Sequence, residues 1–266
     1  MSEEKFESMK LSSSDLITLD VTEGVAKATL NRPPLNILTL AMMRQLAETL
    51  DAVAQLTEVK ALVLAATGKA FCAGVDVADH TPERTEPMIH EFCTLFTHLR
   101  TLPVPTIAVV QGAALGGGTE LAVACDMVLA ATSARFGQPE IKLGVFPPIA
   151  AALFPQLIGY QQAARLLFSG ETITASEAAQ LGLVTFVAAD NELETALERQ
   201  LAQFRAMSAA ALRMTKRALL YGADLGVTRA LPKIEYLYLQ DLMATADARE
   251  GVQAFIEKRQ PLWSDR

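Results

Sequence analysis

Glycines and carboxylates gather in three short segments, and these residues are the best suited to chemistry. The segments are 71–76 (FCAGVD), 112–120 (GAALGGGTE) and 136–140 (FGQPE). The glycines at 116–118 stand between a predicted strand and a predicted helix, where a backbone without Cβ atoms turns sharply and exposes its N–H groups. Such N–H groups suit a phosphate or a developing oxyanion. The alternative is a tight turn packed in the core.

The spacing of these glycines argues against a nucleotide site. A P-loop needs a lysine after its glycines, and none follows the run 116–118. The dinucleotide pattern GxGxxG fails as well, because the third residue after Gly118 is Leu121. An oxyanion hole remains as the functional interpretation.

Two glutamates are the second feature of these segments. Glu120 follows the glycine run inside an otherwise apolar stretch, so its carboxyl group is expected to be at least half buried and to have a shifted pKa. Glu140 follows Pro139 at the end of a predicted strand. Two carboxylates that face one cavity tend to separate their pKa values, which gives one acid and one base. The alternative places Glu120 on a solvated helix face and Glu140 in a loop.

Other reactive side chains form no recognisable site. His80, His90 and His98 lack the spacing of metal ligands, so no metal site is expected. The absence of a G-x-S-x-G elbow leaves a hydrolase triad unsupported. Asn36 and Asp76 either form turns or face a ligand, and the sequence leaves both interpretations open.

The elements that must position these residues alternate between strands and helices. Strands are predicted by apolar runs, and helices by the periodicity of apolar residues. Strands are expected at 16–21, 25–30, 61–66, 106–110, 127–130, around 136 and at 183–187, and helices at 39–56, 87–102, 120–125, 190–207, 208–222, 227–245 and 247–258. Thr174 and Glu177 form a capping box that predicts one more helix start. The fold class is therefore α/β, with a tail over 1–14, a core over 15–190 and a helical C-terminal region over 191–266.

Composition limits the classes of partner. The 266 residues are 51% apolar and 20% charged, as in a soluble globular protein. The formal charge is −7 and no cluster of lysines and arginines occurs, which argues against a nucleic-acid partner. Three scattered cysteines do not make a disulfide framework. No signal peptide and no apolar run of membrane length is found, so a cytoplasmic location and no membrane contact are expected.

Four stretches of the chain resemble the enoyl-CoA hydratase/isomerase (crotonase) family. They read AFCAGVDV, QGAALGGGTELAVACD, FGQPEIKLGVFP and EGVQAFIEKRQP, and the likeness is colinear from about residue 16 to residue 263. The resemblance implies a spiral of ββα turns, a helical C-terminal region used in trimer contacts, and assembly as a homotrimer or homohexamer. It also implies an acyl-CoA thioester substrate and no cofactor, since CoA is part of the substrate.

The resemblance assigns roles to individual residues. The N–H groups of Val75 and Gly117 would form the oxyanion hole, Glu120 would orient and deprotonate the water, and Glu140, protonated, would donate to Cα. The backbone at Ala73, Gly74 and Asp76 would line the CoA channel. Phe255 and Lys258 match positions that reach the CoA of a neighbouring subunit.

One departure from the family pattern bears on the substrate. Where hydratases commonly read PGAGG, this chain has Pro147, Pro148 and Ile149, so a backbone donor near the attacking water is lost and the acyl pocket changes shape. The GVFPP run resembles the cyclohexa-1,5-diene-1-carbonyl-CoA hydratase branch, which hydrates a cyclic dienoyl thioester. The favoured function is an acyl-CoA hydratase, a hydro-lyase. The alternatives are an enoyl-CoA double-bond isomerase and a non-catalytic member that binds acyl-CoA or RNA.

Overall fold

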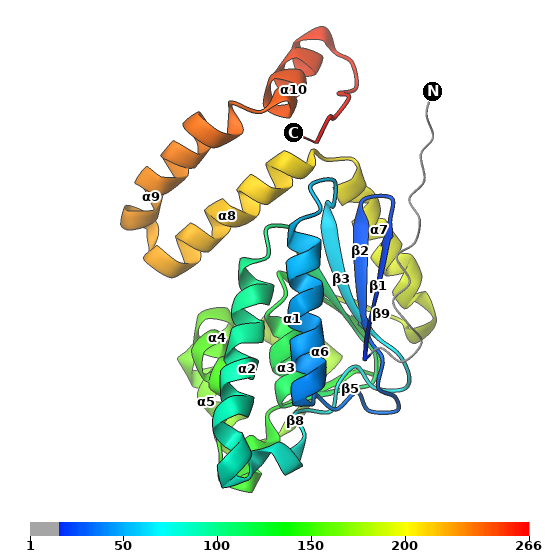
Figure 1. Cartoon of the computed structure of the whole chain (residues 1–266), viewed down its shortest axis with the longest axis vertical. Helices are drawn as coiled ribbons and strands as arrows, with labels where there is room; N and C mark the ends of the chain where they lie inside the picture. Colours follow the sequence, from blue (N-terminus) through cyan, green and yellow to red (C-terminus); the bar gives the residue numbers. More distant parts are fainter. Residues whose placement is uncertain (1–15, 266) are drawn as a thin grey trace.

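The computed structural model describes residues 16–265, and the tail predicted over 1–14 lies outside the described residues. Within the described residues the strands and helices follow one another as shown in Figure 1. The strands are β1 (Ile17–Thr22), β2 (Val25–Leu30), β3 (Ala61–Ala66), β4 (Thr106–Val110), β5 (Ala113–Leu115), β6 (Met127–Ala131), β7 (Arg135–Gly137), β8 (Thr172–Thr174) and β9 (Phe186–Ala188). The helices are α1 (Leu40–Ala54), α2 (Pro82–Thr101), α3 (Gly117–Val123), α4 (Pro148–Ile158), α5 (Tyr160–Ser169), α6 (Ala175–Leu181), α7 (Leu193–Arg205), α8 (Ala209–Leu225), α9 (Val227–Tyr236) and α10 (Ala246–Glu257).

Two sheets carry the spiral. The larger has the order β1-β2-β3-β4-β6-β9, antiparallel only between β1 and β2, and the smaller has the order β5-β7-β8. The chain passes from a strand of the large sheet to a strand of the small one and then to a helix, as in β4-β5-α3. This repeat is the ββα spiral that the family resemblance implied.

Both faces of the large sheet are covered, which explains its continuous apolar strands. On one face Leu62 and Leu64 of β3 join the main core, which includes residues of α1 and α2. On the other face Val63 packs in a second core with Leu197 and Leu201 of α7. In Figure 1, α1 and α2 run side by side over the sheet and α7 lies behind it.

The structure corrects several predicted boundaries. Helix α2 begins at Pro82, after Thr81 as N-cap, so the predicted start at 87 is wrong and Pro87 lies inside the helix. The predicted helix 227–245 is interrupted, because α9 passes into a π-helical turn at Leu237–Leu242. The strand expected at 183–187 lies further along, at Phe186–Ala188. The capping box at Thr174 is confirmed. No helix among residues 16–265 is both long and apolar enough to cross a membrane.

A buried lysine fastens α8 to the large sheet. The Lys216 side chain is 4% exposed, and its Nζ lies 2.8 Å from Asp126 Oδ2 and 3.0 Å from the Val104 carbonyl oxygen. The same carboxylate oxygen accepts a 2.7 Å hydrogen bond from the Thr106 N–H. Asp126, in the loop before β6, thereby ties the end of the core to the C-terminal helices.

We expect Lys216→Met to lower the free energy of unfolding by about 2 kcal/mol, because the charge-assisted hydrogen bonds of the ammonium group are lost. The loss is limited because Asp126 still accepts hydrogen bonds from Thr106 and stays partly exposed to solvent. Urea unfolding followed by circular dichroism measures this. Arg44→Met is the matched control, since it breaks the more exposed pair with Glu91 and should cost less than about 1 kcal/mol. Equal effects of the two substitutions would refute the special role of Lys216.

Candidate active site

The glycine run forms the entrance to α3. Gly116 is the N-cap residue, with φ 52° and ψ −126°, a conformation that residues with a Cβ rarely adopt. A Cβ on Gly116 would also collide with Glu140 Oε1. Glycine at this position therefore lets the Glu140 carboxyl group lie against the backbone at the start of α3.

Val75 lies in a separate, extended segment of the chain, and its side chain is close to Gly117, the first residue of α3. The Gly74 carbonyl accepts from the Leu38 N–H, and the Asp76 N–H donates to the Leu38 carbonyl, both at 2.9 Å. Because neighbouring backbone groups in an extended chain point to opposite sides, the Val75 N–H points away from Leu38. Val75 Cγ2 would lie only 2.8 Å from a Cβ on Gly117. Within the described part of the chain neither the Val75 nor the Gly117 N–H has a protein acceptor.

The side chains of Asn36 and Asp76 both make hydrogen bonds to the backbone that shape turns. Asn36 is fully buried, and its side-chain amide donates to the carbonyls of Thr67 at 2.7 Å and Ala70 at 2.9 Å. The Asp76 side chain accepts from the Ala78 N–H and caps a short helix. Both residues shape the chain on either side of Val75.

Glu120 is buried at the amino end of a second helix. Its carboxyl group is 1% exposed, and its Oε1 accepts a 2.7 Å hydrogen bond from the Ala150 N–H in the first turn of α4. Burial raises the pKa of Glu120 to about 8; the helix N–H groups oppose this rise and the charge of Glu140 adds to it. The interpretation of Glu120 as a solvated helix residue is therefore wrong.

Glu140 lies in a 3-10 turn, Pro139–Leu143, and faces the same place. Burial raises its pKa as well, while its own backbone N–H opposes the rise. The fully buried Gln138 amide, in the orientation that satisfies both its atoms, donates to Glu140 Oε1 at 3.2 Å and Oε2 at 3.1 Å. Such donors favour the ionised form of Glu140. Both carboxyl groups therefore have a raised pKa, and the value of about 8 at Glu120 favours its protonated form at neutral pH.

The remaining candidate residues lie in two places. Pro148 is the first residue of α4, beside Glu120, at a position where a helix needs no N–H. Phe255 and Lys258 are far from the two glutamates of the same chain: α10 lies at one end of the long axis, and β5, which leads into α3, lies toward the other (Figure 1). The Phe255 side chain is 86% exposed.

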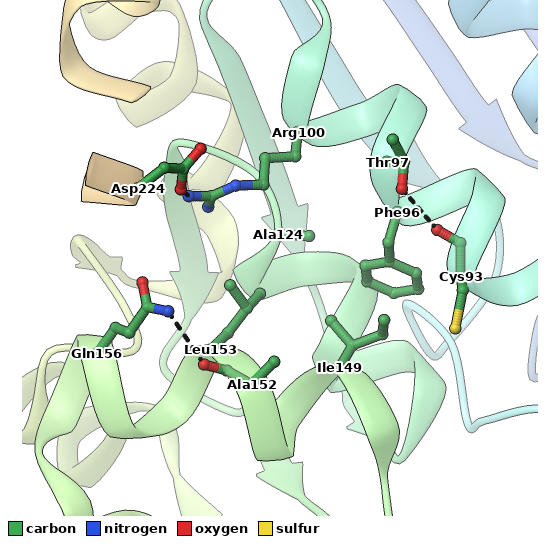
Figure 2. A pocket seen from close by; sticks show the side chains of 10 residues that line it. All are labelled: Cys93, Phe96, Thr97, Arg100, Ala124, Ile149, Ala152, Leu153, Gln156 and Asp224. Carbon is green, nitrogen blue, oxygen red and sulfur yellow. Dashed lines mark hydrogen bonds and ion pairs between the residues drawn. The ribbon is translucent and has the colours of Figure 1, made fainter. Parts of the chain in front are cut away.

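A cavity of about 330 Å³ lies near Glu120, because Ile149 in its wall precedes Ala150, whose N–H donates to Glu120 (Figure 2). This cavity was not predicted from the sequence. It is lined by Cys93, Phe96, Thr97, Arg100, Ala124, Ile149, Ala152, Leu153, Gln156 and Asp224. These residues come from α2, α4, α8 and the C-cap of α3 and share no motif, so only the fold brings them together.

Comparison with known proteins identifies relatives over nearly the whole chain. The profile of a family described as enoyl-CoA hydratase/isomerase matches residues 20–266. A cyclohexa-1,5-dienecarbonyl-CoA hydratase from Thauera aromatica is 36% identical over 94% of this chain and 96% of its own length. A probable enoyl-CoA hydratase from Bacillus subtilis is 34% identical over 92% of this chain and 97% of its own. The crystal structure of an enoyl-CoA hydratase from Mycobacterium smegmatis superposes with a TM-score of 0.89 at 33% identity, covering 94% of this chain and 99% of its own.

Proposed function

The chain belongs to the enoyl-CoA hydratase/isomerase family and has the crotonase fold, and from this premise we propose that it is a hydro-lyase. It adds water across the conjugated double bond of an enoyl-CoA or cyclic dienoyl-CoA thioester. The observation that carries the proposal is the meeting of two carboxyl groups of raised pKa with two backbone N–H groups that lack protein acceptors. The reaction uses no cofactor, because CoA is part of the substrate.

The two N–H groups stabilise the charge that develops on the substrate. As water attacks Cβ, the electrons of the double bond move toward the thioester and leave negative charge on its oxygen. The N–H groups of Val75 and Gly117 bind that oxygen, and they gain most when it is charged. Ala73, Gly74 and Asp76 continue the same backbone segment and line the path of CoA.

The two glutamates act as a pair that holds one proton. The ionised member takes a proton from the attacking water, the protonated member gives one to Cα, and the number of protons on the pair is unchanged. The roles implied by the resemblance require the shared proton to be on Glu140 when water attacks. Burial raises the pKa of Glu120 to about 8, which favours the proton on Glu120. In this scheme substrate binding moves the proton to Glu140, or the two glutamates exchange roles.

The cavity supports an acyl group of ring size. An apolar cavity of about 150 Å³ is enough to hold benzene, and the cavity beside Glu120 has about 330 Å³. Ile149, which follows Pro148, forms part of its wall. These features and the likeness to the Thauera protein favour a cyclic dienoyl thioester, as in the breakdown of aromatic acids.

The C-terminal helices support assembly into a homo-oligomer. They expose large apolar side chains, which a soluble monomer rarely gathers in one region. The exposed residues are Val227, Leu231, Tyr236, Tyr238, Leu239, Val252, Phe255, Ile256 and Leu262. In a trimer or hexamer this surface is covered, and Phe255 and Lys258 come within reach of the CoA of another subunit.

A panel of thioesters tests the reaction. We expect the absorbance of the conjugated thioester to fall when the enzyme meets crotonyl-CoA, longer enoyl-CoA or cyclohexa-1,5-diene-1-carbonyl-CoA, with the largest kcat/KM for the cyclic substrate. In ¹⁸O-labelled water the product must carry the label. An unlabelled product with a shifted double bond would identify an isomerase, and tight binding without reaction would identify a binding protein.

A further inference from the structure

The cavity beside Glu120 has two walls that run away from the carboxylates. On α2, the Phe92 ring lies against Gly117, Phe96 follows one helical turn later, and Arg100 another turn later. On α4, Ile149, Leu153 and Gln156 share one face. Eight residues of helix span about 12 Å, so the α2 wall reaches about that far from the oxyanion hole to Arg100.

One end of the cavity lies near Glu120. Ile149 precedes Ala150, whose N–H donates to Glu120, and Ala124, the C-cap of α3, lies one turn beyond Glu120. Cys93 is close enough to Glu120 for that charge to raise its pKa, after burial, the larger cause. Figure 2 shows Cys93 and Ile149 toward one end of the cavity and Asp224 and Gln156 toward the other.

An ion pair between two parts of the fold lies at the other end. Arg100 Nη2, near the end of α2, lies 2.5 Å from Asp224 Oδ1, near the end of α8. The two residues are separated by 124 positions in the sequence. Between this pair and Glu120 the lining is mostly apolar, through Phe96, Ala124, Ile149, Ala152 and Leu153.

We propose that the Arg100–Asp224 ion pair is the end wall of the acyl pocket and sets the length of the acyl group that the protein accepts. The proposal rests on the proposed function, because it takes the cavity as the place of the acyl group. An acyl chain that starts at Gly117 and Val75 runs along the apolar walls and stops at the guanidinium of Arg100. Helix α8, outside the ββα spiral, thereby takes part in substrate selection.

Substitutions of Arg100 and Asp224 can test this proposal, because both side chains are partly exposed, 33% for Arg100 and 54% for Asp224. An exposed ion pair adds little to stability, so Arg100→Ala and Asp224→Ala are expected to fold. The probes are butanoyl-CoA, octanoyl-CoA and dodecanoyl-CoA, saturated thioesters that bind without reacting. Their dissociation constants are measured by isothermal titration calorimetry.

For the wild type we expect affinity to rise with chain length and then to stop rising. In Arg100→Ala, dodecanoyl-CoA gains a factor of ten or more, since each newly buried methylene contributes roughly fourfold. Asp224→Ala shifts the same way by a smaller factor, because Arg100 loses the partner that holds it across the opening. Butanoyl-CoA binds as in the wild type.

Arg44→Ala is the matched control, an arginine truncation at another ion pair of α2, with Glu91, away from the cavity. It must leave the length profile unchanged. The inference is overturned if Arg100→Ala and Asp224→Ala keep the wild-type profile, or if they weaken all three thioesters equally. If the wild type binds none of the three, the inference fails, whereas the proposed function fails only if the thioesters of the panel are not hydrated either.

Discussion

Replacing Glu120 by glutamine is expected to lower kcat by about 10²–10⁴-fold, the usual contribution of a general acid or base. The amide keeps the shape of the side chain and can still accept the Ala150 hydrogen bond, but it neither takes nor gives a proton. Glu140→Gln should have an effect of the same order, because the pair needs both members to end each turnover with the proton count unchanged. Initial rates on the best thioester of the panel measure both. Near-full rates in both variants would end the assignment.

The same Glu120→Gln substitution should make the protein more stable. The folded-state pKa of about 8 lies above the ordinary value of 4.5, so the folded state binds a proton that the unfolded state releases. The contribution of Glu120 to the free energy of unfolding is therefore at its maximum below pH 4.5 and is lost as the pH rises toward 8. Glutamine has no charge to bury, so its advantage should grow across that window to a few kcal/mol, as an order of magnitude.

Urea unfolding at pH 5 and pH 8 measures this advantage. Glu48→Gln is the charge-matched control: it removes one exposed carboxylate from α1 and should change stability by no more than about 0.5 kcal/mol. If Glu120→Gln were less stable than the wild type at pH 8, the carboxyl group would not carry the burial cost described above. Loss of activity together with a gain in stability is the signature of a group held for chemistry.

The strands of the large sheet were predictable because each buried strand is a long apolar run. The stretches 61–66 and 106–110 are apolar on both sides, so they are stable as strands only in a sheet that is covered on both faces. Strands β5, β7 and β8 have three residues each, too few for a pattern, and only β7 was indicated, through Phe136. Helix α4 was missed because its sequence, PIAAALFPQLI, is apolar on nearly every face and so has no helical periodicity. It also begins with one proline and contains a second.

The site divides in the same way. Val75, Gly117, Glu120 and Glu140 stand in local motifs, so the sequence predicted the residues, and the structure brings them together while their roles stay predictions. Arg100, Gln156 and Asp224 carry no motif, and the fold alone makes them neighbours. A shifted pKa of Glu120 was predicted, but its rise to about 8 was not, because the rise depends on how deeply the fold buries that carboxyl group.

Gly117→Ala is expected to lower kcat by about 10²–10³-fold, the cost of losing one oxyanion donor, with a smaller change in KM. The new Cβ would lie 2.8 Å from Val75 Cγ2 and 3.1 Å from the Phe92 ring. These are side-chain atoms, so the fold can yield, but Val75 must move and its N–H moves with it. A donor that binds the charged transition state more strongly than the substrate changes kcat more than KM.

The choice of Gly117 over its neighbour separates catalysis from folding. A Cβ on Gly118 would collide with the Cys72 carbonyl of the backbone, so Gly118→Ala would lose activity by losing structure. Gly222→Ala is the control for the substitution itself, since a Cβ there meets nothing within 4 Å on α8 and should leave the rate unchanged. Circular dichroism and thermal unfolding are the measurements that test whether Gly117→Ala is folded. A folded Gly117→Ala with a rate within a few fold of the wild type would show that the Val75 and Gly117 N–H groups do not bind the thioester oxygen.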